Sequence, residues 1–308
     1  MTFFAVLIAL VLDQARRPGP QAPWLGAAGA WAAWVQRQFD AGHAVHGWLV
    51  WTVATAAPVL LTALIHALLT QASGLLAFVW TVAVLYVTLG FRQFSHHFTA
   101  IRAALESGDE AGARALFAQW QGGDTVEWPR EELLRRVIAH AILSSHRHVL
   151  GVFVWFVALA MLGLGPAGAV LYRLAAWLAQ AWGGAWRADA PVSQPVAQMA
   201  QRAWCWIDAG PARVTVLGFA MVGHFEDALE RWRQRRRPWS EPSDDLLLSV
   251  AEGAIQVRLS PRVQGEEATA ANLPEPQLAH LASVVGLVWR SVVLWLLLLA
   301  LALLARIF

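Results

Sequence analysis

A tyrosine and an arginine, Tyr172 and Arg173, stand in the middle of an otherwise apolar stretch, GLGPAGAVLYRLAAWLAQAWGG. An arginine in such a segment needs a carboxylate, a carbonyl group or a water-filled cavity, because exposing its charge to lipid is costly. A second segment, WIDAGPARVT, supplies Asp208 and Arg213. We therefore expect Tyr172, Arg173 and Arg213 to line a cavity that opens to the cytoplasm and accepts an anion, such as a phosphate or a lipid headgroup. The alternative is structural, with Arg173 paired to Asp208 or Asp189.

Other patterns that could carry chemistry have simpler explanations. GLGPAG fits the GxGxxG spacing of dinucleotide-binding loops, but that loop follows a strand, and the surroundings here predict membrane helix. Five histidines between residues 96 and 148 could bind a metal or carry protons, yet histidines at a membrane interface need no ligand. His66 lies within a predicted span, where a hydrogen bond to a neighbouring helix would satisfy it. Cys205 is the only cysteine, so no Cys/His spacing suits zinc and no metal site is expected.

The composition indicates the elements that position these residues. Of the 308 residues, 57% are hydrophobic and 14% are charged, with 18 Trp, and the mean hydropathy is +0.47. These values are typical of an integral membrane protein, so we predict an all-α, polytopic membrane helix bundle with cytoplasmic helical connections. The net charge is +2, and all 23 basic residues are Arg, which excludes mechanisms that need a Lys nucleophile, a Schiff base or a P-loop lysine.

Apolar runs of about 20 residues define the predicted membrane segments. Both ends of each hairpin face the same side, and the connections between them are rich in arginine, which places the large loops in the cytoplasm. Tryptophans near span ends, such as Trp48, Trp182 and Trp289, fit anchors at the interface. The predicted order is an N-terminal membrane anchor (1–12), a cytoplasmic connection (13–45), a membrane helical hairpin (46–90), a cytoplasmic helical segment (91–148), a membrane or re-entrant hairpin (149–183), a cytoplasmic region with the PAR motif and a basic cluster (184–285), and a C-terminal transmembrane helix (286–308).

The cytoplasmic connections carry two further predictions. Residues 98–120 read as two helices separated at Gly108 and Asp109, and residues 241–275, rich in Ser, Pro, Gly and charge, read as a loop. The run RWRQRRR predicts a patch that attracts anionic lipid. No nucleic-acid-binding module surrounds it, so nucleic acid is not expected as a partner. The patch consists of Arg231, Arg233, Arg235, Arg236 and Arg237.

Three segments resemble a known superfamily of membrane proteins. GPAGAVLYRL (165–174), DAGPARVT (208–215) and ALESGDEAGARALFAQWQGGDT (104–125) are similar to the paired signatures and helix pair of the CobD/CbiB and AmpE superfamily. The resemblance to CobD/CbiB implies a synthase that joins adenosylcobyric acid to an aminopropanol phosphate in cobalamin biosynthesis, using ATP and Mg²⁺. The resemblance to AmpE implies a bacterial inner-membrane protein linked to β-lactamase induction, without settled chemistry.

Departures from the synthase pattern favour the AmpE-like branch. Ala176 and Ala179 stand where Asn and Asp are expected, LSSHRH (143–148) replaces an acidic segment, and Trp204 and Cys205 replace an acid pair. A ligase that uses ATP normally needs carboxylates for Mg²⁺. GHFEDALERW (223–232) resembles the AmpE pattern instead.

We therefore expect an AmpE-like regulatory protein, not an enzyme, that acts in β-lactamase induction or cell-wall sensing and has no cofactor. A diverged adenosylcobinamide-phosphate synthase is the alternative, and a transporter or lipid-handling protein is a third class. Assembly into a homo-oligomer is compatible with the sequence. The residues expected to bind an anionic small molecule are Tyr172, Arg173, Asp208, Arg213, His224, Glu226 and Asp124.

Overall fold

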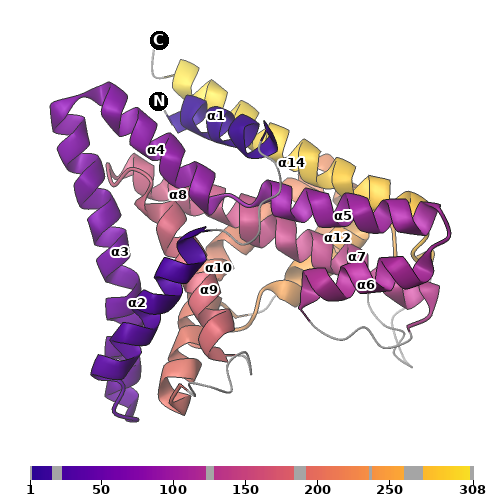
Figure 1. Ribbon diagram of the computed structural model, residues 1–308. Coiled ribbons are helices and arrows are strands. Elements are labelled where there is room, and N and C mark those ends of the chain that lie inside the picture. The colour runs from indigo at the N-terminus through magenta and orange to yellow at the C-terminus, as the bar shows by residue number, and fades with distance from the viewer. Residues whose placement is uncertain are drawn as a thin grey trace. The chain divides into compact units, whose positions relative to one another are not determined.

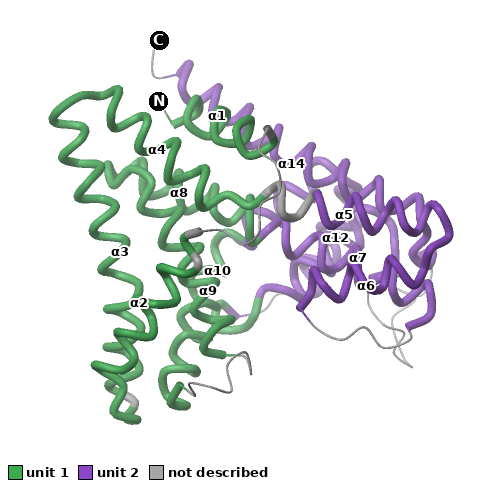
Figure 2. Tube along the Cα trace, viewed as in Figure 1, with its two compact units in different colours: residues 1–90, 147–211, 239–242 green, residues 91–146, 212–238, 243–308 purple. Residues whose placement is uncertain are grey.

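The computed structural model describes residues 2–15, 23–122, 128–183, 192–235, 238–259 and 273–305, and within them it contains helices and no strand (Figure 1). The chain forms two compact units (Figure 2). Unit 1 comprises residues 1–90, 147–211 and 239–242, and unit 2 comprises residues 91–146, 212–238 and 243–308. The helices are α1 (Thr2–Ala15), α2 (Pro23–Phe39), α3 (Ala44–Ala72), α4 (Gly74–Thr88), α5 (Phe91–Glu106), α6 (Glu110–Gln121), α7 (Arg130–Ser145), the π-helical turn η1 (His146–Leu150), α8 (Gly151–Met161), α9 (Ala167–Gly183), α10 (Gln194–Val222), α11 (Phe225–Gln234), α12 (Asp244–Ile255) and α14 (Leu278–Leu304).

Three helices of the described chain are long and apolar enough to cross a membrane: Val45–Ala72, Arg130–Met161 and Leu278–Leu304. Thr2–Gln14 and Gly74–Thr88 are shorter apolar helices. The predicted all-helical membrane protein is thus confirmed. One of these helices, Arg130–Met161, begins well before Val149, because α7, η1 and α8 form one uninterrupted helix.

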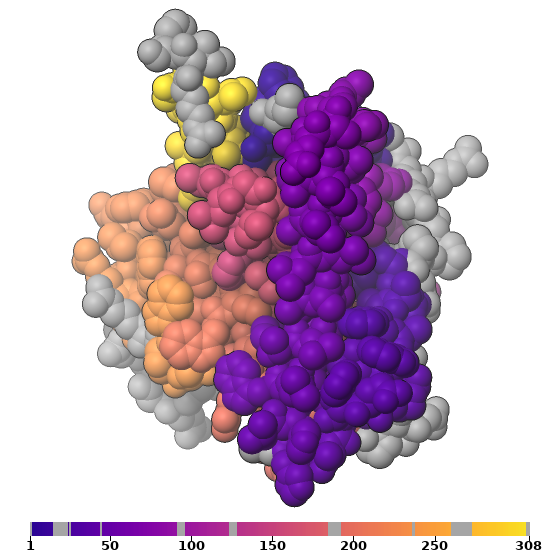
Figure 3. Space-filling model, turned by 90° about the vertical axis from the view of Figure 1, so that its left-hand side faces the viewer, coloured from indigo at the N-terminus to yellow at the C-terminus, as the bar shows by residue number. Residues whose placement is uncertain are grey.

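Helices α3 and α4 form a hairpin around Ser73. The Ser73 hydroxyl accepts a hydrogen bond from the Leu75 backbone N–H at 3.3 Å and so caps α4, while the Ser73 N–H closes α3 on the Leu69 carbonyl. Helix α3 forms a continuous purple column on the face seen in Figure 3. Its leucines Leu60, Leu61, Leu64 and Leu68 are more than half exposed, which suits a helix that faces lipid.

Two prolines interrupt the hydrogen-bond ladders of long helices, and each is matched by a tryptophan. Pro58 in α3 has no N–H, so the carbonyl of Ala54, four residues earlier, lacks its helical donor. The indole N–H of Trp31 in α2 donates to that carbonyl at 3.1 Å. Pro211 in α10 likewise leaves the Ile207 carbonyl without a donor, and the indole of Trp155 in α8 donates to it at 2.9 Å. The same indole group that suits an interface thus ties neighbouring helices together.

Glycine allows α8 and α9 to approach each other closely. Gly165, in the turn between them, has φ +57°, and a Cβ there would collide with the His66 ring. A Cβ at Gly168 would collide with the backbone carbonyl of Trp155. The GPAG segment therefore makes the turn and lets the two backbones pack together, as small residues do between membrane helices.

Unit 2 contains the predicted helix pair. Helix α6 begins where Asp109 accepts a hydrogen bond from the Gly112 N–H at 2.8 Å, so the predicted break at Gly108 and Asp109 is confirmed. The predicted loop at 241–275 is wrong over Asp244–Ile255, which forms α12. Acids in its first turn favour this helix, and buried Leu246, Leu247 and Val250 pack it into the unit.

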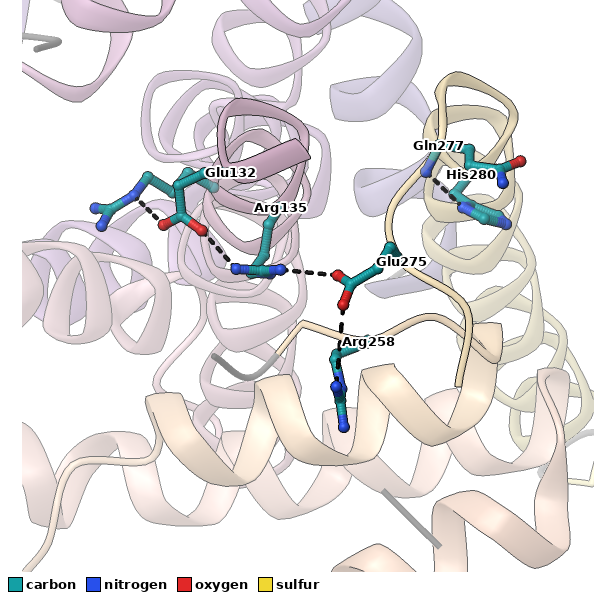
Figure 4. A network of polar contacts seen from close by, with 7 residues as sticks. Glu132, Arg135, Arg258, Glu275, Gln277 and His280 are labelled. Carbon is teal, nitrogen blue, oxygen red and sulfur yellow. Dashed lines mark hydrogen bonds and ion pairs between the residues drawn. The ribbon is translucent and has the colours of Figure 1, made fainter. Parts of the chain in front are cut away.

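A chain of ion pairs connects α7 to the segment that leads into α14 within unit 2 (Figure 4). Arg135 contacts Glu132 one turn away and donates to Glu275 at 2.8 Å. Arg258, whose side chain is almost fully buried, lies 3.9 Å from the other oxygen of Glu275, and its backbone N–H donates to the Pro274 carbonyl. This network fixes the residues that follow α12 beside those that precede α14.

Candidate functional site

The two signature segments meet at a buried hydrogen bond in unit 1. The Tyr172 hydroxyl of α9 donates to the Asp208 carboxylate of α10 at 2.7 Å. Tyr172 is 0% exposed and Asp208 is 1% exposed, so both groups are removed from bulk solvent. A buried carboxylate is costly unless it is hydrogen-bonded, which makes the tyrosine hydroxyl a necessary partner.

Two neighbours make room for this contact and cover it. A Cβ on Gly151 of α8 would collide with the Tyr172 ring, so only glycine fits there. The ring of Trp204 lies 5.1 Å from that of Tyr172, between centroids. One of the two positions where the sequence lacks the expected acid pair thus supplies an aromatic cover for the tyrosine. Pro211, one turn beyond Asp208, is accommodated by the Trp155 indole, as described above.

Two arginine charges act on the Tyr172 hydroxyl in addition to the Asp208 carboxylate. They belong to Arg147, in the π-helical turn η1, and to Arg173, the next residue in α9. π-Helical turns inside α-helices occur frequently at functional sites. Unit 1 therefore holds one buried carboxylate and one buried phenol within the electrostatic reach of two cations.

Arg173 lines a cavity that Tyr172 does not reach. The cavity encloses about 440 Å³ between α2, α3, α4 and α9, and its walls are otherwise almost entirely apolar. The Arg173 guanidinium lies 5.6 Å from the ring centroid of Trp24, a cation–π contact. Among the described residues Arg173 forms no ion pair, so the expected pairing with Asp208 is wrong. Asp189 lies outside the described residues.

The remaining expected ligand residues are dispersed. Arg213 belongs to unit 2 and is not among the residues that line the cavity. Partial burial lowers the pKa of its guanidinium. His224 and Glu226 are exposed at the start of α11, where the His224 backbone N–H donates to the Ala254 carbonyl at 3.1 Å. Asp124 lies outside the described residues.

Four of the five histidines between residues 96 and 148 belong to unit 2, where His97, His140 and His146 contact other side chains. His97 stacks on Trp120, with 12° between the rings, and His140 meets the edge of the same indole at 4.4 Å between centroids. Burial, and then the charge of His96, lower the pKa of His97. His146 shares a hydrogen bond of 2.9 Å with Thr215. Within the described ranges no three His, Cys, Asp or Glu side chains converge as a metal site would require.

The comparison with protein families decides the identity. The sequence pattern of the CobD/CbiB protein family matches residues 2–288. The chain belongs to the CobD/CbiB family. A curated relative from Stutzerimonas stutzeri, named cobalamin biosynthesis protein CobD, is 28% identical over 312 aligned residues, which cover 96% of each chain. A protein of the same name from Chromobacterium violaceum is 29% identical over 226 residues, covering 72% of this chain and 70% of the relative. No solved structure matches.

These relatives overturn the AmpE-like interpretation, because both carry a cobalamin-biosynthesis name. The structure gives a packing role to the residues that favoured the AmpE-like interpretation. Ala176 and Ala179 are buried at 6% and 3% exposure, where small side chains serve the packing of α9 in this CobD/CbiB protein. GHFEDALERW has a packing role as well: Arg231 pairs with buried Glu252, and a Cβ on Gly223 would meet Ala254. The motif thus fastens α11 to α12.

Sequence reasoning missed Gly151 and Trp155, which support the signature segments, and Trp31, which supports α3. A signal for the two tryptophans was present, since a proline inside a long apolar helix leaves a carbonyl in need of a donor. The sequence does not say which of 18 tryptophans supplies it.

Proposed function

We propose that this CobD/CbiB protein is an adenosylcobinamide-phosphate synthase, which joins a carboxylate of adenosylcobyric acid to the amine of an aminopropanol phosphate. The observation that carries the proposal is the relationship to a protein named cobalamin biosynthesis protein CobD over 96% of both chains. The contact between Tyr172 and Asp208 supports it, because it joins the two segments by which the chain resembles synthases.

The reaction needs ATP because a carboxylate is a poor acceptor for an amine. The C–N bond forms as one carboxylate oxygen leaves on the phosphoryl group, ATP becomes ADP and phosphate, and the amine gives up a proton. The chain has no lysine, so arginines must bind the phosphates, and arginine suits phosphate through its paired N–H donors. We assign Arg147, one of the cations that act on Tyr172, to substrate binding.

Magnesium ions usually accompany such a reaction and would shield the phosphate charges of ATP. The described residues do not bring together a set of carboxylates that would hold the ion by themselves. Asp208 is almost fully buried and already accepts a hydrogen bond. We therefore assign no magnesium ligand and route no step through the metal.

We also propose that the protein is a multi-pass protein of the bacterial inner membrane with its large loops in the cytoplasm. The arginine-rich connections support this orientation. Cys205 is buried, so a Cys205→Ala chain with single cysteines placed at Arg233 or Ser73 allows a direct measurement. A membrane-impermeant thiol reagent applied to intact spheroplasts should spare the cysteine at 233 and label the one at 73. Labelling of 233 would contradict the orientation.

The activity assay uses the full chain, purified in detergent, with adenosylcobyric acid, aminopropanol phosphate, Mg²⁺ and ATP. We expect the amide product by mass spectrometry, dependent on ATP, together with an equal amount of ADP. Asp208→Asn should abolish turnover, whereas Glu131→Gln, on an exposed side chain, should leave it unchanged. Absence of product from a folded preparation, under conditions in which a known synthase works, would refute the proposal.

A further inference from the structure

The cavity beside Arg173 has the properties of a lipid-binding site. Its volume of about 440 Å³ lies in the range of small-molecule sites, yet its walls are made mainly of three tryptophans, Trp24, Trp31 and Trp80, together with aliphatic side chains. A phosphate ion alone would fill only a small part of it. The walls require an occupant with a large apolar body.

Two of the residues that line this cavity carry buried donors that have no acceptor in the described part of the chain. The Arg173 Nε and the Trp80 indole nitrogen are both buried without a hydrogen-bond partner among the described residues. Trp31, by contrast, is satisfied by the Ala54 carbonyl, and the Thr88 hydroxyl donates to the Val84 carbonyl. Buried donors without partners are rare because each costs about 1–3 kcal/mol. The occupant should therefore bring oxygen acceptors and a negative charge to Arg173.

The position of the cavity along the α3–α4 hairpin favours a membrane lipid over a soluble anion. Pro58 and Thr88, which line it from the two arms, lie equally far from the Ser73 turn, roughly 22 Å at 1.5 Å per residue. That distance is shorter than the hydrocarbon core, about 30 Å. Measured from a turn at one edge of the core, the cavity thus lies within the hydrocarbon depth, near the end of α4, where a membrane lipid reaches it more readily than a soluble anion. Ala27 and Ala83, both exposed, form part of its rim between α2 and α4.

We propose that this cavity binds an anionic phospholipid, with the phosphate on Arg173 and Trp80 and an acyl chain along the tryptophans and aliphatic side chains. The inference is independent of the synthase activity, because it rests on the cavity and its unpaired donors.

Native mass spectrometry of the full chain in detergent tests the proposal. The probes are phosphatidylglycerol, phosphatidylcholine with the same acyl chains, and inorganic phosphate. We expect the protein to bind phosphatidylglycerol at least tenfold more tightly than phosphatidylcholine, because only the former offers its phosphate without a neighbouring cation. Inorganic phosphate should not compete. Equal binding of the two lipids, or displacement of phosphatidylglycerol by millimolar phosphate, would overturn the assignment.

Three variants locate the bound lipid. Arg173→Gln should weaken phosphatidylglycerol binding roughly tenfold or more, since a charge-assisted contact is lost. Trp80→Phe should weaken it several-fold while the ring is kept. Ala83→Phe should block the site with the charge intact, and it decides the question if Arg173→Gln does not fold. Arg290→Gln, an exposed arginine of α14, controls for loosely attracted lipid and should have no effect. Undiminished binding in Ala83→Phe would refute the cavity as the site.

Discussion

The Tyr172 hydroxyl and the Asp208 carboxylate, 36 residues apart in sequence, are joined by a hydrogen bond of 2.7 Å in the core of unit 1. Tyr172→Phe removes the donor and leaves a buried carboxylate with one partner fewer. We expect a loss of about 1–3 kcal/mol in the free energy of unfolding, measured by denaturant titration in detergent, and a fall in synthase turnover. Tyr86→Phe, on the only other tyrosine, is the matched control, with a smaller expected effect. A Tyr172→Phe protein as stable as the parent would show that Asp208 does not depend on this contact.

Gly168→Ala and Gly210→Ala together distinguish the effect of close helix packing on stability from the effect of helix propensity. A methyl group at position 168 collides with the backbone of Trp155, which cannot rotate away, so we expect a loss of about 1–3 kcal/mol in stability. Gly210→Ala, at a helical glycine with open space around its Cα, should instead be neutral or stabilising by about 0.5–1 kcal/mol. Melting of the two variants in the same detergent provides the comparison, and equal behaviour would contradict the proposed contact between α8 and α9.

Trp155→Phe should lower the free energy of unfolding by more than the smaller buried area of the phenylalanine ring predicts. The variant keeps an aromatic side chain but leaves the Ile207 carbonyl without a donor, for which we expect about 1–3 kcal/mol. Trp206→Phe, whose parent side chain is 59% exposed in the same helix as Ile207, should change stability by less than about 0.5 kcal/mol. The difference between their unfolding midpoints measures the indole hydrogen bond.

The arginines of the RWRQRRR run are predicted to have two different roles, one in stability and one in lipid attraction. Arg231 is mostly buried and pairs at 3.0 Å with Glu252, which is 1% exposed, so Arg231→Ala should destabilise the fold by about 3–5 kcal/mol. Arg233 and Arg235 are exposed, and their replacement by Ala should leave stability unchanged but reduce attachment of liposomes that contain anionic lipid. Arg236 and Arg237 lie outside the described residues. Flotation assays at low and high salt, beside thermal melts, distinguish the two groups.

His97 gives the fold a pH dependence. Burial and the charge of His96 lower its pKa below the ordinary 6.5, so the neutral ring is favoured in the folded protein. As the pH falls below 6.5, the unfolded chain takes up a proton that the folded chain resists, and stability decreases. His97→Gln should make the unfolding midpoint less sensitive between pH 7 and pH 5. An unchanged slope in His97→Gln would rule out this origin.

The sequence predicts where the helices of this protein lie along the chain better than it predicts which neighbours each side chain faces. Apolar runs indicate the hairpins, and the break at Gly108 and Asp109 indicates the helix pair, because these signals are local. Neighbours on a helix, however, point about 100° apart, so Tyr172 and Arg173 serve different surroundings: one meets Asp208, and the other faces a cavity. A sequence pattern does not reveal that difference, since the helix rotation depends on its packing partners.

The branch assignment failed for a related reason. Polar residues missing at Ala176 and Ala179 were given a chemical meaning, whereas both positions are buried between helices. Helix α12 was hidden because Ser, Pro and charged residues around it outweigh its short apolar face. In both cases the deciding information lies in distant segments that pack against the residue.

The pairing of Pro58 with Trp31, and of Pro211 with Trp155, constrains how this chain can vary. Replacing Pro58 by Ala would restore an N–H that reaches the Ala54 carbonyl, and the indole of Trp31 would then have to compete for an acceptor that is already occupied. If the tryptophan alone were replaced, the carbonyl would lack a hydrogen-bond donor. Each proline and its tryptophan are thus expected to be inherited together, and in a related chain the absence of one should foretell the absence of the other.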